Sequence, residues 1–295
     1  MNFLIKILND EKYIKYFLIA PLILLLLFIL GFPSIYDLVF SFFKVELGSL
    51  DNVQYNGIKN FTEVFNDSEF WSSVEFSFKF TVTAVLLEII LGLSIALFFF
   101  SYLKKFKWLI SFMLLPMMTA PALMGIMFRL LLNDFVGVIP QYLSILGFPG
   151  ITFLTREHVY KTLIIIDIIQ WTPFVFILVF AGLQTISKDI IEASKIDGAN
   201  AFQRFESIIL PTITPILVTA GFFRFIDTFR IFDKIYVLTG GGPGNYTTSI
   251  SIYIYKMAFS YGNIGKSIAA SLFLLLFSLI PLYISLKFII RKDLD

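Results

Sequence analysis

The sequence predicts an all-α polytopic membrane protein with about six transmembrane helices, on three observations. Hydrophobic residues make up 58% of the 295 positions and charged residues only 15%, whereas a soluble domain carries about 25% charged residues. The apolar residues come in blocks near the roughly 20 residues that a helix needs to cross hydrocarbon. The blocks lack the period-2 alternation of a membrane β-barrel, and backbone groups in lipid must pair within a segment, so each block is predicted to be a helix.

Six blocks meet this length or come near it, and only two of them contain a charged residue. Those residues are Glu88 in the second block and Asp167 in the fourth, and the fifth block is short. The first block is too long for the apolar core of a signal peptide, so we expect it to be retained as a helix. The blocks are residues 16–36, 80–103, 108–128, 162–187, 207–223 and 267–286.

Clusters of basic residues set the predicted orientation, because positive charge favours the cytoplasmic side of a membrane. With six crossings, three such clusters fall on one side, which places both termini in the cytoplasm. No linker or soluble appendage interrupts the chain, so we expect residues 1–295 to form a single transmembrane domain. The clusters contain Lys6, Lys12 and Lys15, then Lys104, Lys105 and Lys107, then Lys287, Arg291 and Lys292.

The cytoplasmic stretch between the fourth and fifth blocks, about residues 187–207, has a local pattern of its own. Ser187 is a suitable N-cap for a short helix over residues 188–197. Gly198 is expected to end that helix, because glycine adopts the left-handed conformation at low cost. A second short turn is expected before Pro211, which suits the first turn of the fifth helix.

This stretch resembles the EAA motif of bacterial binding-protein-dependent ABC importer permeases. The family pattern is Glu-Ala-Ala, three residues, Gly, nine residues, Ile, any residue, Leu-Pro. Ser194 stands at the third position, where the family has another small residue. The positions that match in register are Glu192, Ala193, Gly198, Ile208, Leu210 and Pro211.

Further stretches are similar to the carbohydrate branch of that family, and the similarity covers nearly the whole chain. They include residues 21–28, 57–61, 239–243 and 253–255. The resemblance implies an ABC importer type I permease core. It also implies a transmembrane permease subunit for a carbohydrate or polyol that is not itself an enzyme, located in the bacterial inner (cytoplasmic) membrane.

The resemblance also implies partners and a coupling contact. The partners are a sister permease, a dimer of ATP-binding subunits that holds ATP and magnesium, and an extracytoplasmic solute-binding protein. Membrane lipid surrounds the spans, and no nucleic acid is expected. The chain contains no phosphate-binding loop, because no Gly-Lys-Ser/Thr follows its glycine-rich run, so we expect no cofactor in this chain. The implied ATPase-coupling residues are Glu192, Ala193, Ser194, Asp197, Gly198 and Phe202.

Two groups of residues are candidates for the substrate path, because ionisable residues in membrane spans usually face the interior or a water-filled cavity. Members of the first group lie three, four and seven positions apart and therefore share one helix face. Both groups match segments that help to form the sugar site in the maltose importers of the family. Rings stack on Trp or Phe, and hydroxyls bond to carboxylate, amide and guanidinium groups. The groups are Asp167, Gln170, Trp171 and Phe174, and then Arg224, Asp227, Thr228 and Ile231.

Alternatives remain open at this point. Asp167 and Arg224 are also compatible with a structural ion pair, and Glu88 and Arg129 are expected to be buried charges that pair or gate. Positive residues would allow an anionic ligand, but the two aspartates oppose a net positive site and favour a neutral sugar. An ion-coupled secondary transporter would also contain buried charges, although the two halves of the sequence show no repeat. An intramembrane enzyme is less favoured, because this chain has no cysteine and its one histidine lies outside the predicted spans.

Overall fold

The computed structural model describes residues 11–48, 53–102 and 107–292. Lys6, Lys104 and Lys105, which contributed to the predicted orientation, lie outside the described residues. Close contacts divide the chain into two compact units, here called unit 1 and unit 2. Unit 1 comprises Met1–Asn66 and Ile254–Phe273, and unit 2 comprises Asp67–Tyr253 and Leu274–Asp295. The assignment of residues 1–295 to one domain stays a prediction.

Unit 1 contains a long apolar helix followed by a small hairpin. The helix runs through α2 (Glu11–Leu26), the π-helical turn η1 (Leu27–Gly31) and α3 (Phe32–Phe40). The side chain of Asn60 is buried and donates to the carbonyl oxygens of Ser41 and Phe43, at 2.8 Å each, which fixes the chain after this helix. The other elements of the unit are the antiparallel strands β1 (Phe43–Lys44) and β2 (Gln54–Tyr55), α4 (Lys59–Phe65) and the turn η4 (Lys256–Ser260).

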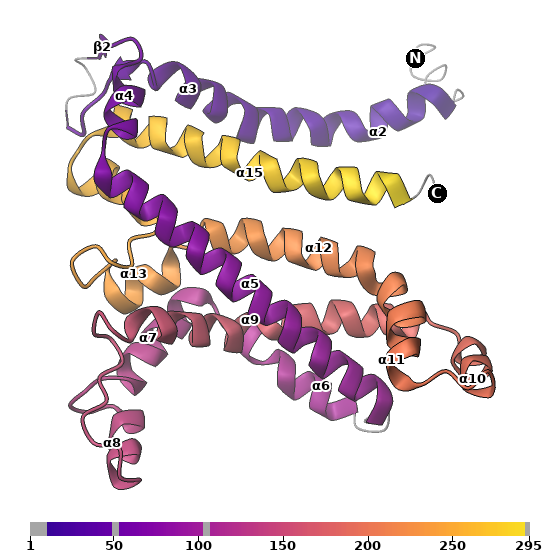
Figure 1. Ribbon diagram of the computed structural model, residues 1–295. Helices are drawn as coiled ribbons and strands as arrows, with labels where there is room; N and C mark the ends of the chain where they lie inside the picture. The colour runs from indigo at the N-terminus through magenta and orange to yellow at the C-terminus, as the bar shows by residue number, and fades with distance from the viewer. Residues whose placement is uncertain (1–10, 49–52, 103–106, 293–295) are drawn as a thin grey trace. The chain divides into compact units, whose positions relative to one another are not determined.

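Three long helices of unit 2 pack against one another, as Figure 1 shows: α5 (Ser68–Tyr102), α9 (Val159–Gln184) and α12 (Leu210–Phe229). Glycines allow close approach at two of the contacts. A Cβ at Gly92 of α5 would lie 2.8 Å from Cβ of Val175, and one at Gly182 of α9 would lie 2.1 Å from Cδ1 of Ile216. Such small residues let helix backbones approach within a membrane.

Three shorter helices and the long C-terminal helix follow. In α14, the hydroxyl of Tyr253 donates to Oδ2 of Asp67 at 2.8 Å. Burial and this carboxylate raise the pKa of the Tyr253 phenol. The C-terminal helix α15 belongs to unit 1 up to Phe273 and to unit 2 from Leu274. These elements are α8 (Val138–Ile145), α13 (Asp233–Thr239), α14 (Ile250–Tyr255) and α15 (Ile264–Lys292).

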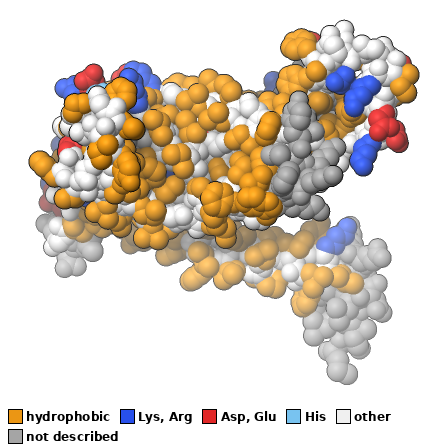
Figure 2. Space-filling view, turned by 90° about the horizontal axis from the view of Figure 1, so that it is seen from below, with side chains coloured by type: hydrophobic (Ala, Val, Ile, Leu, Met, Phe, Trp, Pro, Cys, Tyr) orange, Lys and Arg blue, Asp and Glu red, His pale blue; other side chains and the backbone are white. Residues whose placement is uncertain are grey.

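Five helices in the described part of the chain are long and apolar enough to cross a membrane. Figure 2 shows hydrophobic side chains over much of the visible surface, and Lys, Arg, Asp and Glu side chains gathered in a few places. A surface of this kind suits contact with lipid. The five are 14–40, 68–100, 159–184, 201–229 and 264–285.

The third predicted block is not one helix. Residues 108–128 form α6 (Lys107–Leu114), the 3₁₀ turn η2 (Pro116–Met118) and α7 (Pro121–Leu131). The expectation of an uninterrupted helix there is wrong, because Pro116 and Pro121 both lack the N–H that a continuing helix needs. Thr119, which lies between η2 and α7, has an extended backbone (φ −82°, ψ 132°).

Candidate functional site

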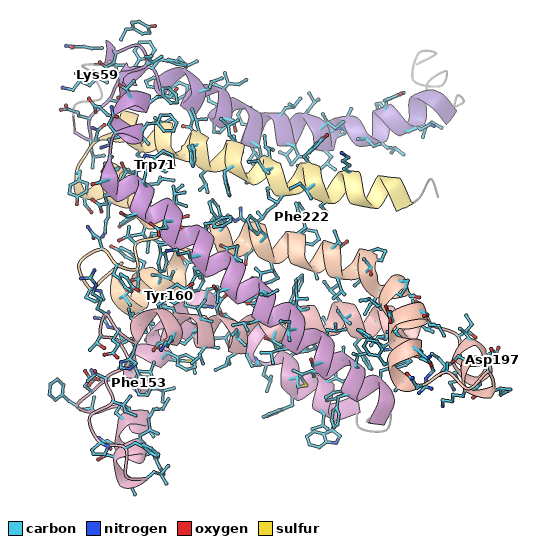
Figure 3. All side chains as sticks on the ribbon, viewed as in Figure 1. Lys59, Trp71, Phe153, Tyr160, Asp197 and Phe222 are labelled. Carbon is cyan, nitrogen blue, oxygen red and sulfur yellow. The ribbon has the colours of Figure 1, made fainter. Side chains whose placement is uncertain are left out.

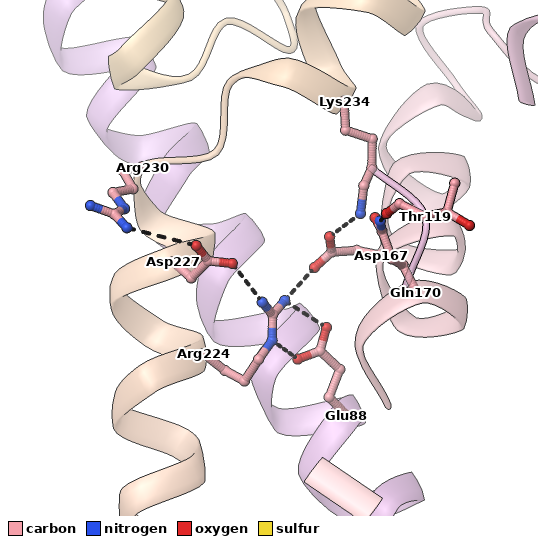
Figure 4. Close-up of polar contacts among 8 residues, drawn as sticks. All are labelled: Glu88, Thr119, Asp167, Gln170, Arg224, Asp227, Arg230 and Lys234. Atoms are coloured by element: carbon pink, nitrogen blue, oxygen red, sulfur yellow. Dashed lines mark hydrogen bonds and ion pairs between the residues drawn. The ribbon is translucent and has the colours of Figure 1, made fainter. Parts of the chain in front are cut away.

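A cluster of buried charges joins the three packed helices of unit 2, with Arg224 of α12 at its centre (Figure 4). The guanidinium donates to both carboxylate oxygens of Glu88 on α5, from Nε at 2.7 Å and from Nη2 at 3.0 Å. Nη2 also donates to Oδ2 of Asp167 on α9, and Nη1 donates to Oδ2 of Asp227, each at 3.0 Å. Glu88, Asp167 and Arg224 are at most 2% exposed, whereas the Asp227 side chain is 47% exposed.

A second buried cation completes the surroundings of Asp167. Lys234 lies near the start of α13, is 1% exposed, and its Nζ donates to Oδ1 of Asp167 (Figure 4). Asp167 therefore binds a different cation with each of its two oxygens. Sequence reasoning did not select Lys234, because it lies outside the apolar blocks in a segment that contains several other basic residues.

The connected charges balance. Arg230 lies 3.9 Å from Asp227, between Nη2 and Oδ1, and is exposed. The set then holds three carboxylates and three cations, so its formal charge is zero. Buried charges without partners are costly in a membrane, and this mutual pairing explains how the spans accommodate them. The set comprises Glu88, Asp167, Asp227, Arg224, Arg230 and Lys234.

Two cavities open beside this cluster and share part of their walls. A cavity of about 240 Å³ has a lining that mixes polar and apolar surface and includes Asp167, Lys234 and Thr228. The hydroxyl of Thr228 is buried and has no hydrogen-bond partner among the residues that the structure describes. A cavity of about 560 Å³ has a mainly apolar lining. The residues that line both are Trp171, Arg224, Asp227 and Arg230.

Trp171 connects the charged and aromatic parts of the site. The guanidinium carbon of Arg224 lies over its ring, 4.6 Å from the centroid, which is a cation–π contact. Phe174 lies edge-on to the same ring with centroids 6.5 Å apart. Phe174, Phe222 and Phe223 line the apolar cavity. The arrangement offers aromatic surface on one side and hydrogen-bonding groups on the other.

Seven of the eight residues predicted for the substrate path line one or both cavities, and Gln170 does not. Gln170 is fully buried, and its Nε2 donates to the carbonyl oxygen of Thr119 at 2.8 Å, where it holds the break between α6 and α7. The ion pair between Asp167 and Arg224 is present as well. The seven are Asp167, Trp171, Phe174, Arg224, Asp227, Thr228 and Ile231.

The two other charges named in the sequence differ from each other. Two roles were expected for Glu88, pairing and gating. The structure shows pairing, because Glu88 forms an ion pair with Arg224. The expectation that Arg129 is buried is wrong. Its side chain is exposed and donates from Nη1 to the carbonyl oxygen of Val237 at 3.1 Å, so it joins α7 to α13.

The predicted coupling segment has the local structure that its sequence indicated. Ser187 caps α10 (Lys188–Ile196) by accepting from the backbone N–H of Asp189. Gly198 follows the helix with a φ of +76°, the left-handed conformation that glycine adopts readily. Asn200 and Gln203 form a capping box for α11 (Ala201–Arg204), which runs through the π-helical turn η3 (Phe205–Ile209) into α12.

Most of the predicted coupling residues face outward. Phe202 is 71% exposed, and Glu192, Ala193, Asp197 and Gly198 are also exposed. Ser194 is the buried exception, and its hydroxyl donates to the carbonyl oxygen of Ile191 at 2.8 Å. Figure 3 shows Asp197 at the opposite end of unit 2 from Tyr160. The segment therefore presents a projecting surface with no partner among the described residues of this chain.

Comparisons with known proteins give one consistent result. Residues 88–292 match the family described as "Binding-protein-dependent transport system inner membrane component". The chain is 37% identical over 257 residues to a probable ABC transporter permease protein of Sinorhizobium fredii, covering 85% of this chain and 82% of the relative. It is 36% identical over 281 residues to a trehalose/maltose transport system permease protein of Thermococcus litoralis, covering 95% and 94%.

A solved structure shares the fold. It is a bacterial ABC transporter involved in the import of the acidic polysaccharide alginate, and it matches with a TM-score of 0.80 and 22% sequence identity. The match covers 94% of this chain and 96% of the other. This chain therefore has the same fold as that chain.

Proposed function

Because this chain belongs to the family of binding-protein-dependent transport system inner membrane components, we propose that it forms the membrane path for a neutral sugar or polyol in an ATP-driven importer. Membership in the family makes the chain a membrane-embedded transport permease. It also favours this function over an ion-coupled secondary transporter, since transport in the family depends on a binding protein.

The proposed assembly contains a sister permease, two copies of an ATP-binding subunit and an extracytoplasmic solute-binding protein, in the inner (cytoplasmic) membrane. The exposed surface of α10, which carries Glu192, and the exposed Phe202 of α11 support a contact with an ATP-binding subunit. ATP and magnesium would be held by that partner, so the chain has no catalytic role of its own. Closure of the ATP-binding subunits would move α10, and through α11 and η3 would move α12, which carries Arg224.

The pair of cavities beside Trp171 and Arg224 carries the proposal about substrate. A sugar has apolar C–H faces and polar hydroxyl edges, and these cavities place aromatic rings next to carboxylate, guanidinium and hydroxyl groups. The balanced charge of the cluster supports a neutral ligand over an anion, which would need uncompensated positive charge. A relative named for trehalose and maltose transport is consistent with this class.

The test is ATP-dependent uptake of radiolabelled trehalose and maltose by the assembly reconstituted in liposomes with its binding protein. Trp171→Ala should lower the rate of uptake at limiting sugar by about two- to tenfold, because the stacking surface is lost. The matched control is Trp108→Ala, which removes a 65% exposed tryptophan outside both cavities and should leave uptake unchanged.

Two results would contradict the proposal. Uptake by the purified chain alone, driven by a proton or sodium gradient, would refute the proposal that the chain works in an ATP-driven assembly. Equal uptake by Trp171→Ala and the unmodified protein would show that this pair of cavities is not part of the substrate path.

A further inference from the structure

A separate cavity lies at the end of unit 2 that is opposite the coupling segment. It has a volume of about 420 Å³, within the range of roughly 300–1,000 Å³ that is usual for small-molecule sites. We call it the outer cavity. A hollow of about 380 Å³ continues from it along α5 and shares Lys79, Tyr160 and Tyr246. Figure 3 shows Tyr160 at this end and Asp197 at the other. The outer cavity is lined by residues 68, 69, 72, 75, 76 and 79 of α5, residues 156 and 160, and residues 244–246.

Glu69 gives the outer cavity an unsatisfied acceptor. Its Oε1 is buried and has no hydrogen-bond partner among the described residues. The backbone N–H of Glu69 is bound by Oδ1 of Asp67 at 2.9 Å, so the first turn of α5 holds this residue in place. A buried polar atom without a partner is costly, and native structures rarely leave one unpaired. The Glu69 side chain lines the outer cavity, so rotation of its carboxylate turns this oxygen toward the cavity, where a bound molecule with hydroxyl donors would satisfy it.

The other walls combine aromatic rings with balanced charge. The guanidinium of Arg156 lies over the ring of Tyr246, 5.5 Å from its centroid. The hydroxyl of Tyr160 donates to Oγ1 of Thr83 at 3.2 Å, which orients its ring in the wall. The same lining contains two carboxylates, Glu69 and Glu75, and two cations, Lys79 and Arg156, and Lys79 pairs with Glu75 one helix turn away. A neutral polyhydroxylated molecule matches this mixture. An ion of either sign would meet as many repelling charges as attracting charges in the lining.

We propose that the outer cavity is a second sugar subsite, which receives the neutral sugar at the extracytoplasmic side before it reaches the cavities at Trp171 and Arg224. The side is assigned from the coupling segment, which lies at the cytoplasmic end. This inference rests on the proposed function, because it takes the same class of substrate. Glu69 binds a sugar hydroxyl, and the rings of Tyr160 and Tyr246 provide apolar surface for the sugar.

The test measures occupancy of the outer cavity without relying on transport. The chain contains no cysteine, so Ser72→Cys places the only thiol of this subunit in the cavity wall, at an exposed position. The intact assembly is reconstituted in nanodiscs, and the rate of labelling by a membrane-impermeant maleimide is measured against the concentration of trehalose or maltose. Both sugars should slow labelling of this thiol in a saturable manner.

Two variants keep the test specific. Ser144→Cys places an exposed thiol on α8, outside the outer cavity, and sugar should not slow its labelling. Glu69→Gln in the Ser72→Cys background should raise the half-protecting sugar concentration about tenfold, because the sugar hydroxyl then binds a neutral amide oxygen in place of a charged carboxylate.

The outcomes separate this inference from the proposed function. Uptake of a sugar without protection of the Ser72→Cys thiol overturns the outer subsite and leaves the proposed function standing. Protection without uptake supports the subsite and counts against the proposed function. Protection by the docked binding protein alone, with none from free sugar, would assign the cavity to protein contact and also overturn the subsite.

Discussion

Replacing Arg224 by methionine tests whether the buried charges act as one unit. In Arg224→Met, both carboxylate oxygens of Glu88 lose their donor, in a position that is fully buried. Asp167 keeps its bond to Lys234. Removing one partner of a buried ion pair costs about 3–5 kcal/mol, because the other charge is left uncompensated. The expected loss of stability is therefore about 3–5 kcal/mol, and it comes mainly from Glu88.

The measurement is the thermal unfolding midpoint of the purified assembly, followed by intrinsic fluorescence. A loss of this size should lower the midpoint by roughly 6–20 °C for a domain of 150–250 residues. Asp227→Asn is the matched control, because it removes another partner of the same arginine whose side chain is 47% exposed. That change should cost no more than about 1 kcal/mol.

The double variant Glu88→Gln, Arg224→Met removes both charges together and should recover more than half of the loss. A midpoint for Arg224→Met that equals that of the unmodified protein would refute the reasoning. A double variant that is no more stable than Arg224→Met would show that the cost arises from packing and not from the unpaired carboxylate.

Three further predictions concern coupling and local stability. Glu192→Lys should abolish sugar-stimulated ATP hydrolysis while the assembly still purifies, whereas Glu206→Lys, also exposed but outside α10, should retain most of it; equal activity of the two would contradict the docking surface. Gly198→Val should impair coupling in the same assay, because a β-branched residue resists a φ of +76°, and full coupling would argue against a fixed turn. Tyr253→Phe removes the bond to Asp67 at 2.8 Å and should cost about 1.5–3 kcal/mol in thermal unfolding, with no change expected in the uptake of trehalose per folded assembly.

Local sequence patterns predicted much of the fold because their causes are local. Apolar blocks of sufficient length indicated the spanning helices, and Ser187 and Gly198 marked the two ends of α10. The break at residues 108–128 was missed although Pro116 and Pro121 were visible in the sequence. Hydropathy averages over a block, and it does not register the loss of a backbone donor at a single position.

The candidate site was predicted only in part, because helix periodicity gives a face and not a neighbour. The shared face of Asp167, Trp171 and Phe174 followed from their spacing, and all three line the cavities. Gln170 has the same spacing but binds the backbone of Thr119, since the turn between α6 and α7 packs against that part of α9. Sequence spacing could not place that turn.

The sequence by itself determined that charges within the spans must be paired or face a cavity, because hydrocarbon cannot solvate them. Only the tertiary structure decided which charges pair. Arg224 is 136 residues from Glu88, and Lys234 is 67 residues from Asp167. Those contacts depend on the axial position and rotation of α5, α9 and α12 and on the placement of α13. These are set by side-chain packing over the full length of the helices, including the close approach at Gly92 and Gly182.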